Sequence, residues 1–418
     1  MSVLNRFSLA VLVATLATVG FASAQTLTLS STGSGSSGNG GHISGGGSGT
    51  FSPGGSATVT FTGNGSSDNC TNVVQLSLNI AVTGGDTLTL LFNAQIPASL
   101  NTPDLYASGT FNGTLNVTGG TGTYSGKGGA GTATLAVQKS VKTFTYVLNG
   151  SLTLAGPLVP LTTITPNGIV PVFTDTPLIQ PGTWISIYGT NLTNTTALWN
   201  GDFPTSLGGI TVSINGKPGY FWFVSPGQLN LQAPDDTVRG CVPVVISTPG
   251  GTVSTSVELA NVSASLSLLD GTYVAAVIPT PYGGGAYGGG TYDLAGPVGR
   301  FAFATRPVKR GETVVLYGVG LGPTQPAVPA GKVFSGAAAT VNRVQVLLGN
   351  NVSSFLEGFL EAPVAFSGLV GAGLYQLNIT VPANAPTGDV VVQVNVQIPN
   401  GTEGSQTSSR FNAILAVQ

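Results

Sequence analysis

Charge is scarce in this chain of 418 residues, because Asp, Glu, Lys and Arg make up only 7% of it and the formal net charge is −2. Glu, Lys and Arg are common on helix surfaces, so their scarcity argues against a helical protein. Positive charge gathers only at Arg300, Arg306, Lys309 and Arg310. Nucleic-acid binding normally needs a broad basic face. We therefore expect no nucleic-acid partner, and we interpret these four side chains as a solvated surface.

Histidine occurs once, and its position in the sequence leaves histidine-based catalysis without a candidate base. His42 lies in a Gly- and Ser-rich tract, where nothing in the sequence would orient it as a general base. Asp235 and Asp236 are adjacent, but neighbours in an extended segment point to opposite sides, so they do not converge like the paired carboxylates of a glycosidase. No Cys/His cluster or calcium-loop pattern is present. We expect no catalytic residue, no cofactor and no metal site.

Cysteine occurs twice, as Cys70 and Cys241, which are separated by 171 positions and fall in different predicted domains. Small disulfide scaffolds carry many more cysteines. Nothing in the sequence indicates that the two Cα atoms come within the roughly 7 Å that a bridge needs. We therefore predict that both are unpaired, and that Cys241 points away from the core of its own domain.

The sequence also lacks an apolar run of the about 20 residues that a transmembrane helix needs. Its longest apolar run near the start, Leu9 to Phe21, follows Arg6 and leads to Ala22-Ser23-Ala24. A basic residue, a short apolar region and small residues before a cleavage point are typical of a secretory signal peptide. We predict a signal peptide over residues 1–24, a secreted or cell-surface location, and no membrane span in the mature chain.

Gly, Thr, Ser, Val and Asn dominate the rest of the chain, and this composition favours strands joined by tight turns. The sequence predicts an all-β protein of three domains. A Gly-, Ser- and Thr-rich antiparallel β domain, either a barrel or a sandwich, occupies residues 25–157. Two tandem Ig-like β-sandwiches follow over residues 158–262 and 263–418. The Gly-rich tract at residues 31–49 is interpreted as a flexible lead-in or long loop.

An internal repeat carries the prediction of two sandwiches. The stretch "IQPGTWISIYGTNL", which begins at Ile179, aligns with "VKRGETVVLYGVGL", which begins at Val308. "GITVSING" then aligns with "RVQVLLGN", and "GQLNLQAP" aligns with "YQLNITVP". The offset between the copies grows from one block to the next, and loops absorb insertions more readily than strands do, so the three blocks are predicted to be strands. Alternating short strands over 100–150 residues are the pattern of an Ig-like sandwich.

Together these blocks resemble the C-terminal module of secreted acidobacterial proteins of unknown function, with IPT/TIG-type Ig-like domains. The resemblance covers about Thr162 to the end of the chain and implies no established activity. The segment "FNGTLNVTGGTGTYSGKGGAGTATL", which begins at Phe111, is similar to a hairpin of small secreted β-barrels of the dirigent-like kind. The alternative is a Gly-rich hairpin of some other antiparallel sheet.

Aromatic residues are the candidate contacts for a ligand or a partner. In "GYFWFV", Tyr220 and Trp222 fall on one side of a strand and Phe221 and Phe223 on the other. One side faces the core, whereas the other either stacks on a sugar or a surface protein, or packs on the neighbouring domain. We expect Trp222 to be more than half buried. A Gly-rich insert supplies the further candidates, which are Tyr282, Tyr287 and Tyr292, and this insert is either an adaptable binding loop or a spacer.

The repeated Gln-x-Asn pairs are interpreted as structural. Gln228 and Asn230 alternate with apolar residues in the first copy, and Gln376 and Asn378 do so in the second. We expect these amides to satisfy backbone groups of a crossing loop once in each sandwich. The sequence thus favours a non-catalytic, exported structural or adhesive protein. The alternative is a carbohydrate-binding protein that uses exposed aromatic residues, so the partner is a glycan or another surface protein.

Overall fold

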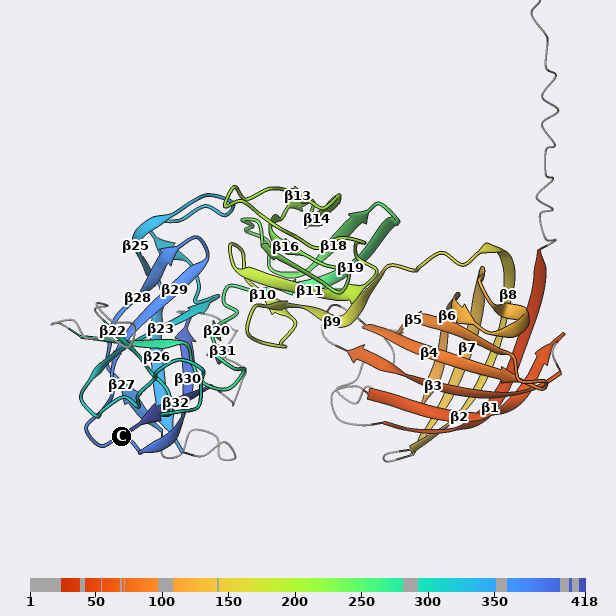
Figure 1. The fold of residues 1–418 in the computed structure, drawn as a ribbon, viewed down its shortest axis with the longest axis horizontal. Coiled ribbons are helices and arrows are strands. Elements are labelled where there is room, and N and C mark those ends of the chain that lie inside the picture. The colour runs from red at the N-terminus through yellow and green to blue at the C-terminus, as the bar shows by residue number, and fades with distance from the viewer. Residues whose placement is uncertain are drawn as a thin grey trace, which may run out of the picture.

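The protein is all-β, as predicted. The computed structural model describes residues 24–37, 42–53, 55–67, 70, 72–96, 108–140, 143–280, 292–350, 359–398, 406–407 and 413–418. Residues 1–23 of the expected signal peptide lie outside this set. Strands form three bodies that follow one another along the longest axis of the molecule (Figure 1). Each body has its own core, with Phe92, Ile187 and Val392 as fully buried examples.

The first body is a closed antiparallel barrel of eight strands, in which each strand pairs with the next and β1 pairs with β8. Its strands are β1 (Gln25–Ser37), β2 (His42–Ser52), β3 (Gly55–Ser67), β4 (Asn72–Val82), β5 (Thr87–Gln95), β6 (Gly109–Gly120), β7 (Lys127–Ser140) and β8 (Thr143–Pro157). Alternate side chains fill the interior, because successive residues of a strand face opposite sides. A 3₁₀ turn at Gly122–Tyr124 precedes β7.

The interpretation of residues 31–49 as a flexible segment is wrong, because β1 and β2 run through most of this tract. Their inward positions are largely glycines, and aromatic rings from other strands occupy the space that side chains would need. A Cβ on Gly33 would lie 2.8 Å from the ring of Tyr146, and one on Gly45 would lie 2.6 Å from the ring of Phe61. The glycines therefore leave space for large aromatic rings inside a narrow barrel.

The second body is a sandwich of two sheets. One sheet has the strand order β12 (Ala197–Leu198), β16 (Tyr220–Val224), β17 (Gln228–Gln232), β11 (Trp184–Thr190) and β9 (Thr163–Pro171). The other has the order β10 (Leu178–Ile179), β19 (Gly251–Leu259), β18 (Gly240–Thr248), β14 (Ile210–Ile214) and β13 (Ser206–Leu207), and β15 (Lys217–Pro218) pairs with β14. Asn215 and Gly216 adopt φ values of 51° and 75° in the turn between β14 and β15, and a tight hairpin turn needs such positive φ values.

The third body repeats this arrangement. One sheet has the order β22 (Tyr292–Leu294), β21 (Ala276–Pro279), β23 (Thr313–Val319), β29 (Leu374–Thr380), β28 (Val364–Gly371), β25 (Ser335–Thr340) and β24 (Thr324–Gln325), and β20 (Ser265–Leu266) pairs with β23. The other has the order β27 (Leu360–Ala362), β26 (Arg343–Gly349), β30 (Gly388–Gln397) and β31 (Gln406–Thr407), and β32 (Ile414–Val417) pairs with β30.

The repeat predicted from the sequence matches the topology of the two sandwiches. In the first, β17 lies between β16 and β11, and in the second, β29 lies between β28 and β23. The pairing of β14 with β18 likewise corresponds to that of β26 with β30. The aligned blocks are therefore equivalent strands, and the extra residues of the second copy lie in its connections.

Candidate functional site

Tyr220 and Trp222, the aromatic pair predicted as a contact surface, have different surroundings. The ring of Tyr220 lies against Gly331 of the second sandwich, so closely that a Cβ on this glycine would overlap the ring. Trp222 retains 41% of its surface exposed, and it is thus more than half buried, as expected. A register shift in β16 lies between Phe221 and Phe223, and Phe221 is fully buried in the core. Tyr220 therefore packs on the neighbouring sandwich, as the domain-packing alternative requires.

Trp222 belongs to an aromatic cluster that holds every tryptophan of the chain. Trp184 is central, with ring-centroid distances of 5.6 Å to Trp199, 6.2 Å to Trp222 and 6.1 Å to Phe203. The indole N–H of Trp184 donates to the carbonyl oxygen of Ala372, in the second sandwich, over 2.7 Å. The cluster therefore supports the junction of the two sandwiches and exposes Trp222 at its edge.

A buried hydrogen-bond network reinforces this junction. The side-chain oxygen of Gln180, in the first sandwich, accepts from the backbone N–H of Gly322, in the second, over 2.7 Å. The amide nitrogen of Gln180 donates to the hydroxyl of Tyr375 over 3.3 Å, and this hydroxyl donates to the carbonyl oxygen of Gly322. Burial raises the pKa of Tyr375 to about 12, because the phenolate would lose its hydration there.

A second set of contacts lies beside it. The side-chain oxygen of Gln232 accepts from the backbone N–H of Gly331 over 2.8 Å, while its amide nitrogen donates to the carbonyl oxygen of Gly182 over 2.8 Å. The carboxylate of Asp235 accepts from the backbone N–H of Ala330 over 2.9 Å. Side chains of the first sandwich therefore satisfy loop backbone groups of the second.

The adjacent acids diverge, as expected for neighbours in an extended segment. Asp235 reaches the second sandwich, whereas the carboxylate of Asp236 accepts from the side-chain amide of Asn215 over 2.9 Å and lies 3.3 Å from the ammonium of Lys217. The backbone N–H of Val238 contributes most to lowering the pKa of Asp236 to about 2, and Asn215 and Lys217 lower it further. Asp236 therefore anchors the hairpin turn of its own sandwich.

The two Gln-x-Asn pairs bond within themselves. The Gln228 amide nitrogen donates to Oδ1 of Asn230 over 2.8 Å, and that of Gln376 donates to Oδ1 of Asn378 over 2.7 Å. In the first sandwich Asn230 also accepts from the hydroxyl of Ser186 over 3.0 Å. The amides on one strand face thus satisfy one another, and the crossing-loop backbone that we expected as their partner takes no part in these bonds.

The tyrosine candidates of the Gly-rich insert fall partly outside the described residues, which do not include Tyr282 and Tyr287. Tyr292 lies on β22, an outer strand of its sheet, and is 39% exposed. Of this set the structure places only Tyr292, which belongs to the second sandwich, whereas Tyr220 and Trp222 lie on β16 of the first.

The prediction that the two cysteines are unpaired is wrong. Cys70 and Cys241 form a disulfide, with their Cα atoms 5.3 Å apart. Cys241 lies on the outer side of β18 and points away from its own core, as predicted, but this side faces the barrel. Cys70 lies two positions before Asn72, the first residue of β4 in the barrel. The positions of the two cysteines in the sequence did not indicate the bond, because the contact depends on how the barrel docks on the first sandwich.

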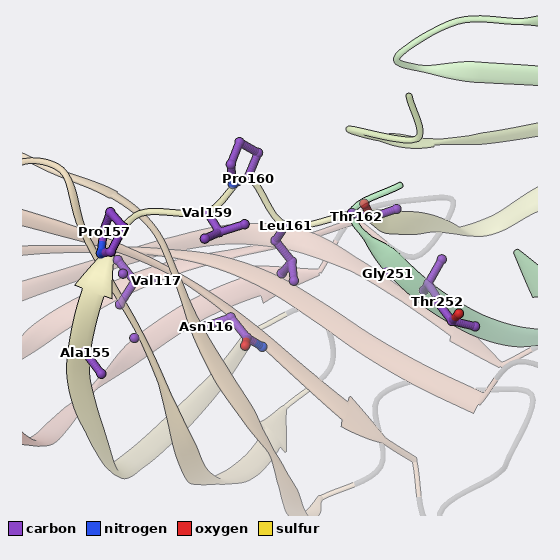
Figure 2. Close-up of a pocket in the computed structure, with 14 residues that line it drawn as sticks. Asn116, Val117, Ala155, Pro157, Val159, Pro160, Leu161, Thr162, Gly251 and Thr252 are labelled. Atoms are coloured by element: carbon purple, nitrogen blue, oxygen red, sulfur yellow. The ribbon is translucent and has the colours of Figure 1, made fainter. Parts of the chain in front are cut away.

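A crevice separates the barrel from the first sandwich and flanks the connecting segment at residues 158–162. Two adjoining hollows of about 300 and about 360 Å³ make up this crevice. Figure 2 shows the first, in which the connecting segment passes between the end of the barrel and Gly251 and Thr252 of β19. Cys70 lines the second hollow, so the disulfide lies at the crevice. Sequence reasoning identified none of its polar residues.

Within the described ranges, no group of three or more His, Cys, Asp or Glu residues is placed to hold a metal ion. The described part of the chain also contains no helix with the length and apolar character needed to cross a membrane.

Comparisons with known proteins identify no family. No family model and no curated protein matches the chain. Among solved structures, the crystal structure of a "Putative membrane anchored protein" from Corynebacterium diphtheriae aligns over 94% of this chain and 95% of that chain, with 10% sequence identity and a TM-score of 0.14. A similarity this low carries no conclusion about location or function.

Proposed function

We propose that this chain is an exported, non-catalytic structural protein in which two tandem sandwiches hold the N-terminal barrel in a fixed orientation at the cell surface or outside the cell. The resemblance of the C-terminal half to secreted acidobacterial modules of the IPT/TIG type and the predicted signal peptide are part of this proposal. An adhesive role follows if the barrel, as the presented domain, contacts a glycan or another surface protein.

The observation that carries the proposal is that both junctions between the three bodies are fastened. The Cys70–Cys241 disulfide ties the barrel to the first sandwich. Gln180, Gln232 and Asp235 bind backbone groups of the second sandwich. Domains in one chain usually move relative to one another unless their interface is strong, so this fastening favours a spacer. Disulfides also persist in oxidising compartments outside the cytosol.

Small-angle scattering of the oxidised mature chain tests the proposal. We expect one arrangement of the three bodies to account for the whole profile. The double variants Cys70→Ser/Cys241→Ser and Gln232→Ala/Asp235→Ala should each increase the radius of gyration, because each loosens one junction. Gln228→Ala is the matched control, since this side chain lies on the same strand as Gln232 but bonds within its own sandwich.

Circular dichroism should show that all these variants keep the strand content of the wild type, so that a change in scattering reports on orientation alone. A wild-type profile that requires a mixture of orientations would contradict the spacer. So would junction variants whose profiles coincide with that of Gln228→Ala.

A further inference from the structure

The crevice between the barrel and the first sandwich is one continuous site. Its two hollows share Asn116, Leu161, Thr162, Thr252 and Val253, so the connecting segment divides the space without closing it. Each hollow has a volume near the lower end of the range for small-ligand sites, which is about 300–1,000 Å³. Such sites form preferentially at the interfaces between domains.

The barrel wall of the crevice carries side-chain amides on three neighbouring strands. Gln75 of β4 lies directly opposite Asn93 of β5 in the register, and Asn116 of β6 lies opposite Leu91 of β5. Gln95 is the next outward residue of β5. These four amides make no hydrogen bond to any residue that the structure describes. Each one keeps two N–H donors and a carbonyl acceptor for an external partner.

Hydroxyl groups face these amides from the sandwich. Residues 252–256 of β19 and residues 163–166 of β9 line the opposite wall. Among these, Ser254 and Thr255 have side chains without a hydrogen-bond partner in the described part of the chain. Ile164 and Val253 add apolar surface between the polar groups. The two walls thus combine hydroxyls, amides and small aliphatic patches.

The lack of charged side chains in the crevice indicates the class of ligand. The described residues that line the two hollows include no Asp, Glu, Lys, Arg or His. A charged ligand would therefore give up hydration without gaining a counter-charge, which is unfavourable, whereas a ligand with many hydroxyls exchanges hydrogen bonds with amides and hydroxyls. We infer that the crevice is a binding site for an uncharged oligosaccharide, held between the barrel and the first sandwich.

The disulfide gives this site its fixed shape. The two walls belong to different bodies, so their separation depends on the docking that the Cys70–Cys241 bond holds in place. A site that already has its bound shape binds more tightly, because less conformational entropy is lost when the ligand binds. The inference does not depend on the spacer proposal, because a hinged barrel would still present both walls, although with lower affinity.

Calorimetric titration of the oxidised mature chain with short gluco-, manno-, galacto- and xylo-oligosaccharides tests the site, with oligogalacturonate as the acidic comparison. We expect at least one neutral oligosaccharide to bind and the acidic one to bind more weakly. The variant Gln75→Ala/Asn93→Ala should weaken this binding by at least about tenfold, since it removes two sets of hydrogen bonds.

Asn79→Ala is the matched control, because it removes an exposed amide from the same strand, β4, outside the crevice, and it should bind like the wild type. Trp222→Ala should also keep full affinity. The inference is overturned if no neutral oligosaccharide binds the wild type, or if an uncharged extended peptide binds in their place. It is also overturned if Trp222→Ala abolishes binding while Gln75→Ala/Asn93→Ala does not, because the aromatic cluster would then be the site.

Discussion

Asn230 and Asn378 occupy equivalent positions on β17 and β29, yet their surroundings differ. Asn230 is only 8% exposed and accepts from both Gln228 and Ser186. Asn378 is more exposed, and among the described residues only Gln376 donates to its side chain. Ser186 is itself buried. Its hydroxyl therefore depends on the Asn230 amide in a way that has no counterpart in the second sandwich.

We predict that Asn230→Ala costs about 1–3 kcal/mol of stability, because it leaves the buried Ser186 hydroxyl without a partner. Asn378→Ala, the matched control, should cost clearly less, since the released Gln376 amide reaches water. Urea unfolding followed by tryptophan fluorescence measures the first change, because all three tryptophans lie in the first sandwich, and calorimetry measures the second. Equal costs at the two positions would show that burial of the serine hydroxyl is unimportant.

Sequence reasoning at this scale identified which residues share a strand face but not which atoms they meet. The alternation of Gln228 and Asn230 with leucines correctly predicted which face of β17 points away from the core of its own sandwich. Gln232 continues the same alternation, but its partner Gly331 is 99 residues away and gives no local signal. One signal was available: the aligned position in the second copy holds Thr380. A long amide side chain found in only one copy points to a role outside the shared fold.

At the scale of elements, strands with alternating apolar residues were predictable, whereas the Gly-rich strands were not. Between Ile43 and Phe51 the inward positions of β2 are Gly45, Gly47 and Gly49, and a glycine has no side chain to show a period of two. Ile43 and Phe51 are in phase with these glycines and are buried. That phase relation across the tract was the signal in the sequence for a continuous strand.

The same geometry predicts different outcomes for alanine substitutions at two adjacent glycines. On Gly47 a new Cβ would overlap the carbonyl oxygen of Thr32 and lie 2.7 Å from Cα of Gly33. On Gly46, which faces outward, the nearest atom is the carbonyl oxygen of Val59, at 3.2 Å. We predict that Gly47→Ala destabilises the barrel by about 1–3 kcal/mol through overpacking, whereas Gly46→Ala changes it little. Thermal unfolding monitored by far-ultraviolet circular dichroism gives the comparison, and equal melting temperatures for the two variants would contradict inward crowding.

At the scale of the whole molecule, the sequence predicted the three bodies but not how they join. The repeat specified two copies of one sandwich, since equivalent strands keep their pattern. The contacts between the sandwiches are made by residues that differ between the two copies. Trp184 aligns with Thr313, and Gln180 aligns with Lys309. The disulfide was missed for the same reason, because its second cysteine aligns with Asp389. Junctions are encoded in departures from the repeat.

Tyr375 makes the junction of the two sandwiches sensitive to alkali. Its pKa is raised by burial from about 10 to about 12, so the neutral hydroxyl is the form that the folded protein favours. A raised pKa contributes stability that is fully present below pH 10 and is lost as pH rises towards 12. The loss corresponds to about 2–3 kcal/mol. Deprotonation also removes the proton that the hydroxyl donates to Gly322.

We therefore predict that the wild type loses more stability between pH 10 and pH 12 than Tyr375→Phe does, although the variant is less stable at neutral pH because Gln180 and Gly322 lose a partner. Melting temperatures measured by calorimetry across this range give the comparison. Subtracting the two curves cancels the titration of the other tyrosines, since both proteins contain them. Tyr188→Phe, which removes an exposed hydroxyl, should follow the wild-type curve. Parallel curves for the wild type and Tyr375→Phe would show that this hydroxyl does not couple alkali to the junction.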